Sequence, residues 1–261
     1  MRRAARRPPL REPPLSSPES GETALTDISK SPDRIAGMFD AIAGRYDLLN
    51  HLLSAGIDRR WRRRAIDSLQ LTGRERVLDL CTGTADLAIA AARARPPAAR
   101  VVGVDFAGAM LGVGRQKLER ARLAERVTLV RGDATRIPVA DRSVDAVTIA
   151  FGIRNVDEVA AACREMRRVL RRNGRLAILE FAVPTVPGLS RLYLGYLHHI
   201  LPRVGRVVSR HNAAYGYLPA SIGAFSTPKE FIAILSGAGF SSISAQSLTF
   251  GSVILYTAVS T

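Results

Sequence analysis

Two acids in neighbouring apolar segments stand where their carboxylates could bind a small polar ligand. Asp79 lies in the first segment, four residues before Gly83, and Asp105 ends the second. A tight turn and an alanine-rich helical pattern beginning at Asp86 separate the two segments. A nucleotide-binding βαβ unit has this order: a strand, a turn, a helix, a second strand and an acid. Its ligand lies beyond the carboxyl ends of the strands.

The turn between these acids favours S-adenosylmethionine (SAM) over NAD. A dinucleotide site normally shows G-x-G-x-x-G, whereas this turn holds only Gly83. A carboxylate at Asp79 would repel a pyrophosphate, but it suits a ligand with a cationic amino-acid end. Asp105 can accept hydrogen bonds from ribose hydroxyls. A single-glycine turn is a weak motif, and Asp79 alternatively only caps the turn.

The composition sets limits on size and partners. With 261 residues the chain can bury one full core, or one core and a small appendage. Its net charge of +15 indicates an anionic partner surface, nucleic acid or lipid, unless the arginines reflect compositional bias alone. Only two cysteines occur, Cys81 and Cys163, and neither lies in a metal-spaced cluster. We therefore expect no bound metal and a reducing compartment.

The first 30 residues read as a separate arm. They hold five arginines before position 12, several prolines and almost no large apolar residues, so we expect this arm to be disordered. It has no apolar segment of the kind that a secretory signal requires. Residues 31–261 then form the expected single domain.

Helical patterns fill residues 31–70. The first helix begins at Pro32, with Ser31 as its cap, and Gly44 separates it from a second. Asp58 is expected to cap a third helix. The arginines of this helix are predicted to form a solvated face, or else a patch that contacts phosphate or lipid: Arg59, Arg60, Arg62, Arg63 and Arg64.

Beyond the βαβ unit, strands and helices continue to alternate. Asp157 is expected to cap the helix that follows the fourth strand, and Thr227 begins a capping box with Glu230. The pattern predicts an α/β fold, a Rossmann-like doubly wound sheet, and its final pair of strands suits the seven-stranded class I SAM-dependent methyltransferase sheet with an antiparallel last strand. Further strands are predicted at 126–130, 144–150, 175–181 and 253–259.

Residues 184–222 interrupt this alternation and are predicted to form a helical lid over the substrate. An apolar stripe at helical spacing runs through the lid, with arginines between its members. The stripe either packs the core of the lid or faces a membrane. Its residues are Leu189, Leu192, Tyr193, Tyr196, Leu197, Ile200 and Leu201.

Three stretches carry a resemblance to a known family over roughly residues 31–260. They are Tyr46 to Asn50, followed by Ser54 and Trp61; Phe151-Gly152-Ile153-Arg154-Asn155-Val156; and residues 168–176. In these stretches the chain resembles the quinone-biosynthesis C-methyltransferases that make menaquinone and ubiquinone.

The resemblance implies how SAM is bound. Asp105 would accept hydrogen bonds from the ribose hydroxyls, and Asp133 would accept one from the adenine amino group. Thr84 and Ala134 would also contact SAM. Asp79 and Gly83 complete the predicted set of SAM-binding residues. Cys81 and Ala85 occupy positions where the family commonly has glycine, which leaves open whether either takes a positive φ. Ala150 replaces a serine common on the ubiquinone side, which favours the menaquinone branch.

The implied reaction is carbon methylation of demethylmenaquinol to menaquinol; the alternative is a polyprenyl methoxy-benzoquinol of ubiquinone biosynthesis. Arg154, Asn155 and Tyr46 are the candidate catalytic residues. Arginine is a poor base, so we expect Arg154 to stabilise the phenolate while water carries the proton. Three of the predicted site residues also have simpler alternatives. Tyr46 could be a core tyrosine, Arg154 could form an ion pair with Asp157 or Glu158, and Asp133 could be an ordinary acid at the end of a strand.

A polyprenyl quinol substrate lies in the bilayer, so we expect a cytoplasmic enzyme that is peripheral at the inner face of a bacterial membrane. Anionic lipid would then account for the positive charge, and no nucleic-acid partner is expected. An RNA methyltransferase and a non-catalytic basic membrane-binding protein are the rival interpretations. A homo-oligomer stays open.

Overall fold

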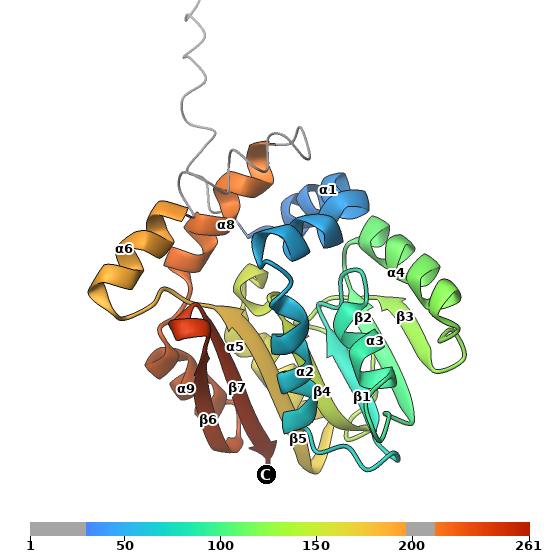
Figure 1. Cartoon of the computed structure of the whole chain (residues 1–261). Helices are drawn as coiled ribbons and strands as arrows, with labels where there is room; N and C mark the ends of the chain where they lie inside the picture. The colour runs from blue at the N-terminus through green and yellow to red at the C-terminus, as the bar shows by residue number, and fades with distance from the viewer. Residues whose placement is uncertain (1–29, 197–211) are drawn as a thin grey trace, which may run out of the picture.

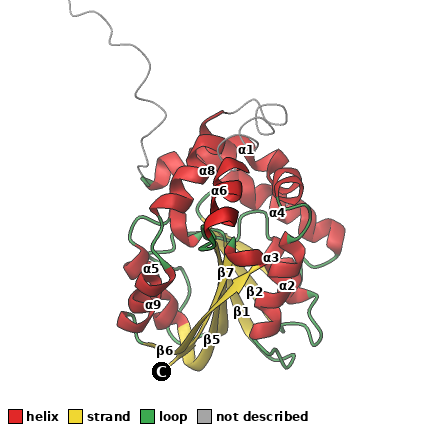
Figure 2. Ribbon diagram, turned by 60° about the vertical axis from the view of Figure 1, so that its left-hand side comes forward, coloured by secondary structure: helices red, strands yellow, loops and turns green. Residues whose placement is uncertain are grey.

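A computed structural model describes residues 30–196 and 212–261, and over these ranges a seven-stranded sheet lies between layers of helices (Figures 1 and 2). The strands are β1 (Arg76–Leu80), β2 (Arg100–Asp105), β3 (Val127–Arg131), β4 (Val144–Ala150), β5 (Leu170–Phe181), β6 (Phe240–Leu248) and β7 (Val253–Ser260). The helices are α1 (Pro32–Leu53), α2 (Asp58–Ser68), α3 (Asp86–Ala92), α4 (Gly108–Ala121), α5 (Val159–Val169), α6 (Pro187–Gly195), α8 (Asn212–Ala224) and α9 (Pro228–Gly237). Two 3₁₀ turns complete them, η2 (Ile153–Asn155) and η4 (Thr249–Gly251).

The strand order is β3-β2-β1-β4-β5-β7-β6, and β7 pairs antiparallel with both of its neighbours. The other pairings, from β3 through β5, are parallel. The predicted α/β sheet with an antiparallel last strand is therefore confirmed. The order reverses between β1 and β4, and ligands of open α/β sheets bind in the crevice at such a point.

Two hydrophobic cores, one on each face, hold the helices against the sheet. Trp61 and Ile66 of α2 pack with α3 and the end of α4 on one face. Met166 of α5 and Phe231 of α9 are fully buried on the other. Apolar side chains on both faces explain why the parallel strands are almost continuously hydrophobic.

A third group of helices, α1, α6 and α8, lies over the carboxyl ends of the parallel strands (Figure 1). Gly44 does not divide α1, which runs unbroken from Pro32 to Leu53, so the predicted break was wrong. Of the predicted lid, α6 and α8 belong to this group. The stripe residues Leu197, Ile200 and Leu201, like the arm before residue 30, lie outside the described ranges.

Of the predicted helix caps, one is confirmed and two were wrong. The capping box at the start of α9 is present, with Thr227 accepting from the Glu230 N–H and Glu230 from the Thr227 N–H. The predicted caps at Asp58 and Asp157 were wrong, because α2 begins at Asp58 itself and α5 follows Glu158. Neither of these two helices has a side-chain cap, so packing fixes where they start.

Candidate active site

Asp105 holds the turn after β1 against the end of β2. Its Oδ2 accepts the N–H of Gly83 at 2.8 Å, and its Oδ1 accepts the N–H of Ala107 at 2.9 Å. The side chain is buried, and burial raises the pKa of the Asp105 carboxyl. Each carboxylate oxygen can accept a second hydrogen bond. Two of the predicted SAM-binding residues, Asp105 and Gly83, thus lie in direct contact.

Asp79 lies beneath the same turn. Its Oδ2 accepts from the Thr82 hydroxyl at 2.5 Å, and its Oδ1 accepts from the Thr148 hydroxyl at 2.8 Å. Burial raises the pKa of Asp79 to about 6, although both hydrogen bonds oppose this shift. The bond to Thr82 is what a turn cap requires, yet Asp79 also lines a small cavity. The two roles coexist.

The turn is strained at two non-glycine positions. Cys81 has a φ of +53° and Ala85 a φ of +68°, so both take the left-handed conformation that the sequence left open. This conformation disfavours an L-residue by roughly 1–2 kcal/mol. Gly152 shows how closely the turn is packed, because a Cβ there would lie 2.4 Å from the Cβ of Cys81. The turns after β1 and β4 therefore touch.

The small cavity, of about 30 Å³, lies beside this turn. Its charged lining groups are two carboxylates, Asp79 and Asp86, and the guanidinium of Arg62. Asp79 can accept from the ammonium of a zwitterionic amino acid, and Arg62 can donate to its carboxylate. The donor set therefore fits the methionine end of SAM. Its lining residues are Tyr46, Arg62, Asp79, Cys81, Thr82, Gly83, Thr84, Asp86, Leu87 and Ala150.

The remaining predicted SAM contacts make bonds within the protein. Asp133 is exposed and its Oδ1 accepts from the N–H and hydroxyl of Thr135, as the strand-end alternative requires. Ala134 is buried beside it. Thr84 donates its hydroxyl to Asp47 Oδ1 at 2.5 Å. Contacts of these residues with SAM stay predictions.

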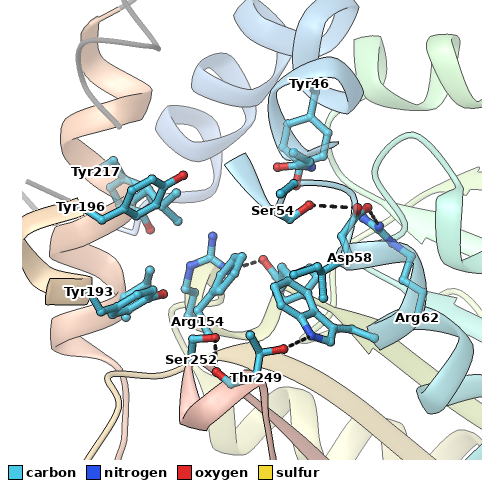
Figure 3. A pocket seen from close by; sticks show the side chains of 18 of the residues that line it. Tyr46, Ser54, Asp58, Arg62, Arg154, Tyr193, Tyr196, Tyr217, Thr249 and Ser252 are labelled. Carbon is cyan, nitrogen blue, oxygen red and sulfur yellow. Dashed lines mark hydrogen bonds and ion pairs between the residues drawn. The ribbon is translucent and has the colours of Figure 1, made fainter. Parts of the chain in front are cut away.

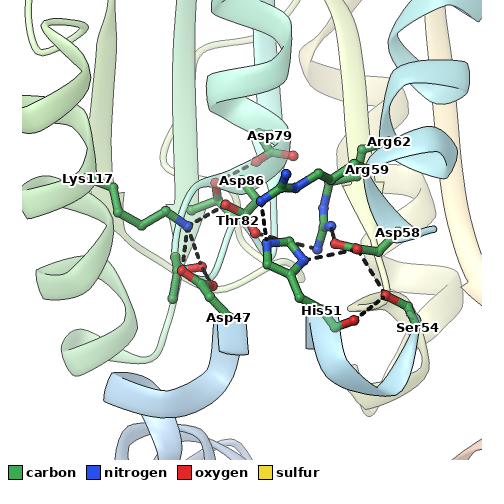
Figure 4. A network of polar contacts seen from close by, with 11 residues as sticks. Asp47, His51, Ser54, Asp58, Arg59, Arg62, Asp79, Thr82, Asp86 and Lys117 are labelled. Atoms are coloured by element: carbon green, nitrogen blue, oxygen red, sulfur yellow. Dashed lines mark hydrogen bonds and ion pairs between the residues drawn. The ribbon is translucent and has the colours of Figure 1, made fainter. Parts of the chain in front are cut away.

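Lys117 connects α1 to the turn after β1 (Figure 4). This turn, residues 81–85, is called the cofactor turn because it is predicted to bind SAM. Its ammonium donates to Asp47 Oδ2 at 2.7 Å and to the Thr84 hydroxyl at 3.2 Å, and it pairs with Asp86. Asp47 follows Tyr46 on α1, Thr84 lies in the turn and Asp86 begins α3. One ammonium group therefore bridges two carboxylates and reduces the repulsion between them.

Replacing Lys117 by methionine should weaken SAM binding about 3- to 10-fold, or roughly 1 kcal/mol. Asp47 would lose its cation while Asp86 would keep only the longer contact with Arg62 at 3.7 Å, so repulsion between the two acids would loosen α1 over the turn. Isothermal titration calorimetry measures the change, with the exposed Arg115→Met on the same helix as control. Unchanged affinity would show that α1 does not need this contact.

A larger cavity, of about 320 Å³, opens next to the small one (Figure 3). Tyr46 and Arg62 line both cavities and so mark where they meet. Aromatic and aliphatic side chains form most of its wall, with Tyr193, Tyr196 and Tyr217 opposite Asp58 and Arg62. Further wall residues are Met38, Phe39, Ile42, Asn50, Ser54, Ala55, Ile57, Trp61, Phe151, Arg154, Phe181, Leu218, Ile222, Thr249 and Ser252.

Arg154 stands in the wall of this cavity and is 5% exposed. Its Nη1 donates to Glu180 Oε1 at 2.7 Å and to the carbonyl of Phe151, and its Nε lies 3.3 Å from the Ser221 hydroxyl. The ring of Phe181 lies 5.4 Å from the guanidinium carbon. Nη2 has no partner within the described part of the chain. The ion-pair partner is thus Glu180, not Asp157 or Glu158 as the alternative supposed.

Tyr46 and Asn155 differ in their relation to the cavity. Tyr46 lines it, and burial raises the pKa of its hydroxyl, so this group is a neutral donor at pH 7. Asn155 is buried, does not line the cavity, and its Oδ1 has no hydrogen-bond partner among the residues described. The structure therefore brings Tyr46 and Arg154 to one cavity and leaves Asn155 behind it.

Sequence reasoning missed three buried charges. Arg62, assigned to the solvated face of its helix, is 7% exposed and pairs with Asp58. The spacing of four between them was the available signal. Glu180 is fully buried on β5, and no residue close to it in the sequence indicated an ion pair.

Over the described ranges, no group of three metal-ligating side chains occurs.

Comparison with known proteins agrees with this geometry. The model of the ubiE/COQ5 methyltransferase family matches residues 27–260. The chain is 43% identical over 229 residues to the ubiquinone/menaquinone biosynthesis C-methyltransferase UbiE of Citrifermentans bemidjiense, covering 88% of this chain and 97% of that one. It is 38% identical over 244 residues to the demethylmenaquinone methyltransferase of Bacteroides fragilis, covering 94% and 99%.

Solved structures share the fold at low identity. The [4+2]-cyclase SpnF aligns with a TM-score of 0.64 at 16% identity, covering 88% of this chain and 96% of SpnF. A SAM-dependent methyltransferase from Thermotoga maritima aligns with a TM-score of 0.59 at 17% identity, covering 86% and 99%. The sheet is thus that of class I SAM-dependent methyltransferases, a fold that also carries other chemistry.

Proposed function

The chain belongs to the ubiE/COQ5 methyltransferase family, and from that premise we propose that it transfers a methyl group from SAM to a ring carbon of demethylmenaquinol, giving menaquinol. One observation carries the proposal. A mostly apolar cavity of about 320 Å³ meets the cofactor turn at Tyr46 and Arg62 and holds the buried Arg154 in its wall. The apolar wall can pack against a flat aromatic headgroup, and the guanidinium of Arg154 can donate a hydrogen bond to an oxygen of that headgroup.

In this proposal the methionine end of SAM lies in the small cavity, with its ammonium at Asp79 and its carboxylate at Arg62. Gly83, Thr84 and Asp105 would hold the ribose side, and Asp133 and Ala134 the adenine. SAM supplies an electrophilic methyl group. The role of the protein is to place that methyl in line with the ring carbon in the neighbouring cavity, a gain of proximity and orientation.

Arg154 stabilises the quinolate. A phenol ionises near pH 10 in water, and the ring carbon becomes nucleophilic when the proton leaves. Nη2 of Arg154 points to no protein partner within the described ranges, whereas Nη1 and Nε are anchored. A fixed cation beside the developing negative charge lowers its free energy without reorganisation. Tyr46 donates a second hydrogen bond to the quinol oxygens.

A competition assay tests the substrate. Purified protein receives methyl-labelled SAM with equal amounts of a short-tail demethylmenaquinol and a short-tail methoxy-benzoquinol. We expect label chiefly in the naphthoquinol, since Ala150 occupies a position where family members on the ubiquinone side commonly have serine. Label chiefly in the benzoquinol would move the protein to the ubiquinone branch. Label in neither would contradict the proposal and leave an RNA methyltransferase or a non-catalytic protein.

The affinity for SAM should rise with pH. The pKa of Asp79 is raised to about 6, so below that pH its carboxyl is neutral and cannot attract the ammonium. At pH 5 about one tenth of Asp79 is ionised, and Kd should be about tenfold higher than at pH 7. Asp79→Asn should bind weakly and lose this dependence. A wild-type Kd that is flat from pH 5 to 7, with circular dichroism unchanged, would contradict the assignment.

We also propose that the face carrying α6 and η4 meets the membrane in which the quinol lies. Leu192 is 72% and Phe250 is 81% exposed, and Val186 and the exposed Arg191 lie nearby on the chain. Thr249 and Ser252 flank Phe250 and line the cavity, so this face borders the site. Within the described ranges, no helix is long and apolar enough to span a bilayer.

Replacing Leu192 and Phe250 together by serine should lower binding to vesicles of anionic lipid at least about tenfold, because two large apolar contacts are lost. Co-sedimentation measures the binding, and activity on a detergent-dissolved short-tail quinol serves as control. That activity should stay within about twofold. Equal sedimentation of wild type and variant would show that another face meets the lipid.

A further inference from the structure

Asp58 is the one carboxylate in the wall of the larger cavity, within the part of the chain that the structure describes. Its side chain is almost completely buried, at the start of α2 and across the cavity from the tyrosines of α6 and α8 (Figure 3). Asp58 lies in the first turn of α2, makes no side-chain cap there and pairs with Arg62. The reaction proposed above must release one proton for each methyl group, and neither Arg154 nor the neutral Tyr46 can accept it.

The contacts of Asp58 leave one acceptor position on its carboxylate. Oδ1 accepts from the Ser54 hydroxyl at 2.9 Å and lies 3.0 Å from His51 Nδ1. Oδ2 pairs with Arg62. Each carboxylate oxygen can accept two hydrogen bonds, so Oδ2 keeps one lone pair for a quinol hydroxyl.

His51 continues this contact toward solvent. Its side chain is 31% exposed, whereas that of Asp58 is 3% exposed. The second ring nitrogen, Nε2, lies 3.5 Å from the guanidinium of the exposed Arg59 (Figure 4). The pair therefore reaches from the cavity wall to the protein surface, as a proton path requires.

We propose that Asp58 accepts the quinol proton and that His51 passes it to solvent, a role that rests on the proposed methylation of a quinol. The quinol O–H bond breaks, its electron pair stays on the oxygen, and the proton moves to Asp58. His51, in the tautomer that carries its hydrogen on Nε2, takes that proton at Nδ1 and releases the Nε2 proton to water. Proton exchange with solvent then restores the starting tautomer. After the ring carbon has taken the methyl group, its own hydrogen returns as a proton to the oxygen, so one proton leaves per turnover.

The charges around Asp58 explain why it needs His51. Burial raises the pKa of the Asp58 carboxyl, but Arg62, His51 and Ser54 together lower it below its ordinary value. A proton therefore does not remain on Asp58, and the imidazole of His51, 3.0 Å away, is the group in contact that can take it. The other charged and titratable groups around the pair are Arg59 on α2, Asp86 behind Arg62, Tyr46 on α1 and Arg154 across the cavity.

The test compares two quinols in single-turnover experiments. One is the ordinary demethylmenaquinol with a short tail; the other carries ring halogens, so that its hydroxyl is already ionised at the assay pH. The variants are His51→Asn, whose amide can keep a polar contact with Asp58 but cannot relay a proton, and Asp58→Asn. Because Asp58→Asn leaves Arg62 without its carboxylate partner, His51→Asn is the decisive variant if the other fails to fold.

We expect His51→Asn to methylate the ordinary quinol about 100-fold more slowly than wild type, within the range of general acid–base catalysis. On the ionised quinol it should stay within about threefold of wild type. A loss of the same size on both quinols, or no loss on either, would overturn the relay while leaving the methyltransferase intact. Wild type that methylates neither quinol would instead contradict the proposed function, and the relay with it.

Discussion

Arg154→Ala is expected to slow methyl transfer at least about 1,000-fold in single-turnover experiments, while the Kd for SAM changes less than about threefold. A removed donor to a developing oxyanion has an effect of this order. The SAM affinity should hold because Arg154 lines the larger cavity and not the small one beside the cofactor turn.

Arg154→Lys provides the matched control. A lysine keeps the charge but cannot contact Glu180, Phe151 and the quinol from one planar group, so we expect an intermediate rate. Rapid quenching with labelled SAM measures the rates, and calorimetry measures the binding. Equal losses of rate and of SAM affinity in Arg154→Ala would show that this residue only supports the fold of the site.

Glu180→Ala should lower the free energy of unfolding by about 3–5 kcal/mol, the loss that follows when one partner of a buried ion pair is removed. Glu180 is fully buried and accepts from the N–H of Arg154, the N–H of Phe181 and the Arg154 guanidinium. Without it, the guanidinium stays buried and uncompensated.

Urea denaturation followed by Trp61 fluorescence measures this loss. The exposed Glu119→Ala is the control and should change the free energy by less than about 0.5 kcal/mol. Adding Arg154→Met to Glu180→Ala should recover part of the stability, because no charge is then left buried. A double variant as unstable as Glu180→Ala alone would show that packing around Glu180, and not the charge, accounts for the loss.

The sheet was predictable from sequence because its signals are local. β4 has the predicted bounds, and the capping box of α9 is present where the pattern placed it. The bounds of α1 and α2 were less predictable. Gly44 is exposed and its Cβ position is open, so packing of α1 on α4 decides whether the helix continues.

Some residues that line the two cavities were predictable from sequence, but their ion pairs were not, and the roles of these residues stay predictions. Tyr46 and Arg154 stood out in motifs, yet the partner of Arg154 lies 26 positions away on β5. Arg62 looked like one of five surface arginines. Only the fold turns it inward, between Asp58 and the ring of Phe151, whose centroid lies 5.9 Å from its guanidinium. The pair between Arg154 and Glu180 depends on β4 and β5 lying side by side, which composition and spacing do not encode.

The most direct measurement of the central claim is the position of the transferred methyl group. Wild-type protein with SAM labelled by ¹³C at the methyl and a short-tail demethylmenaquinol should give a product whose label resonates as a methyl on an aromatic carbon. That result follows from an in-line methyl donor and a quinolate held at Arg154. A label that resonates as a methoxy group, or that stays on SAM, would contradict it.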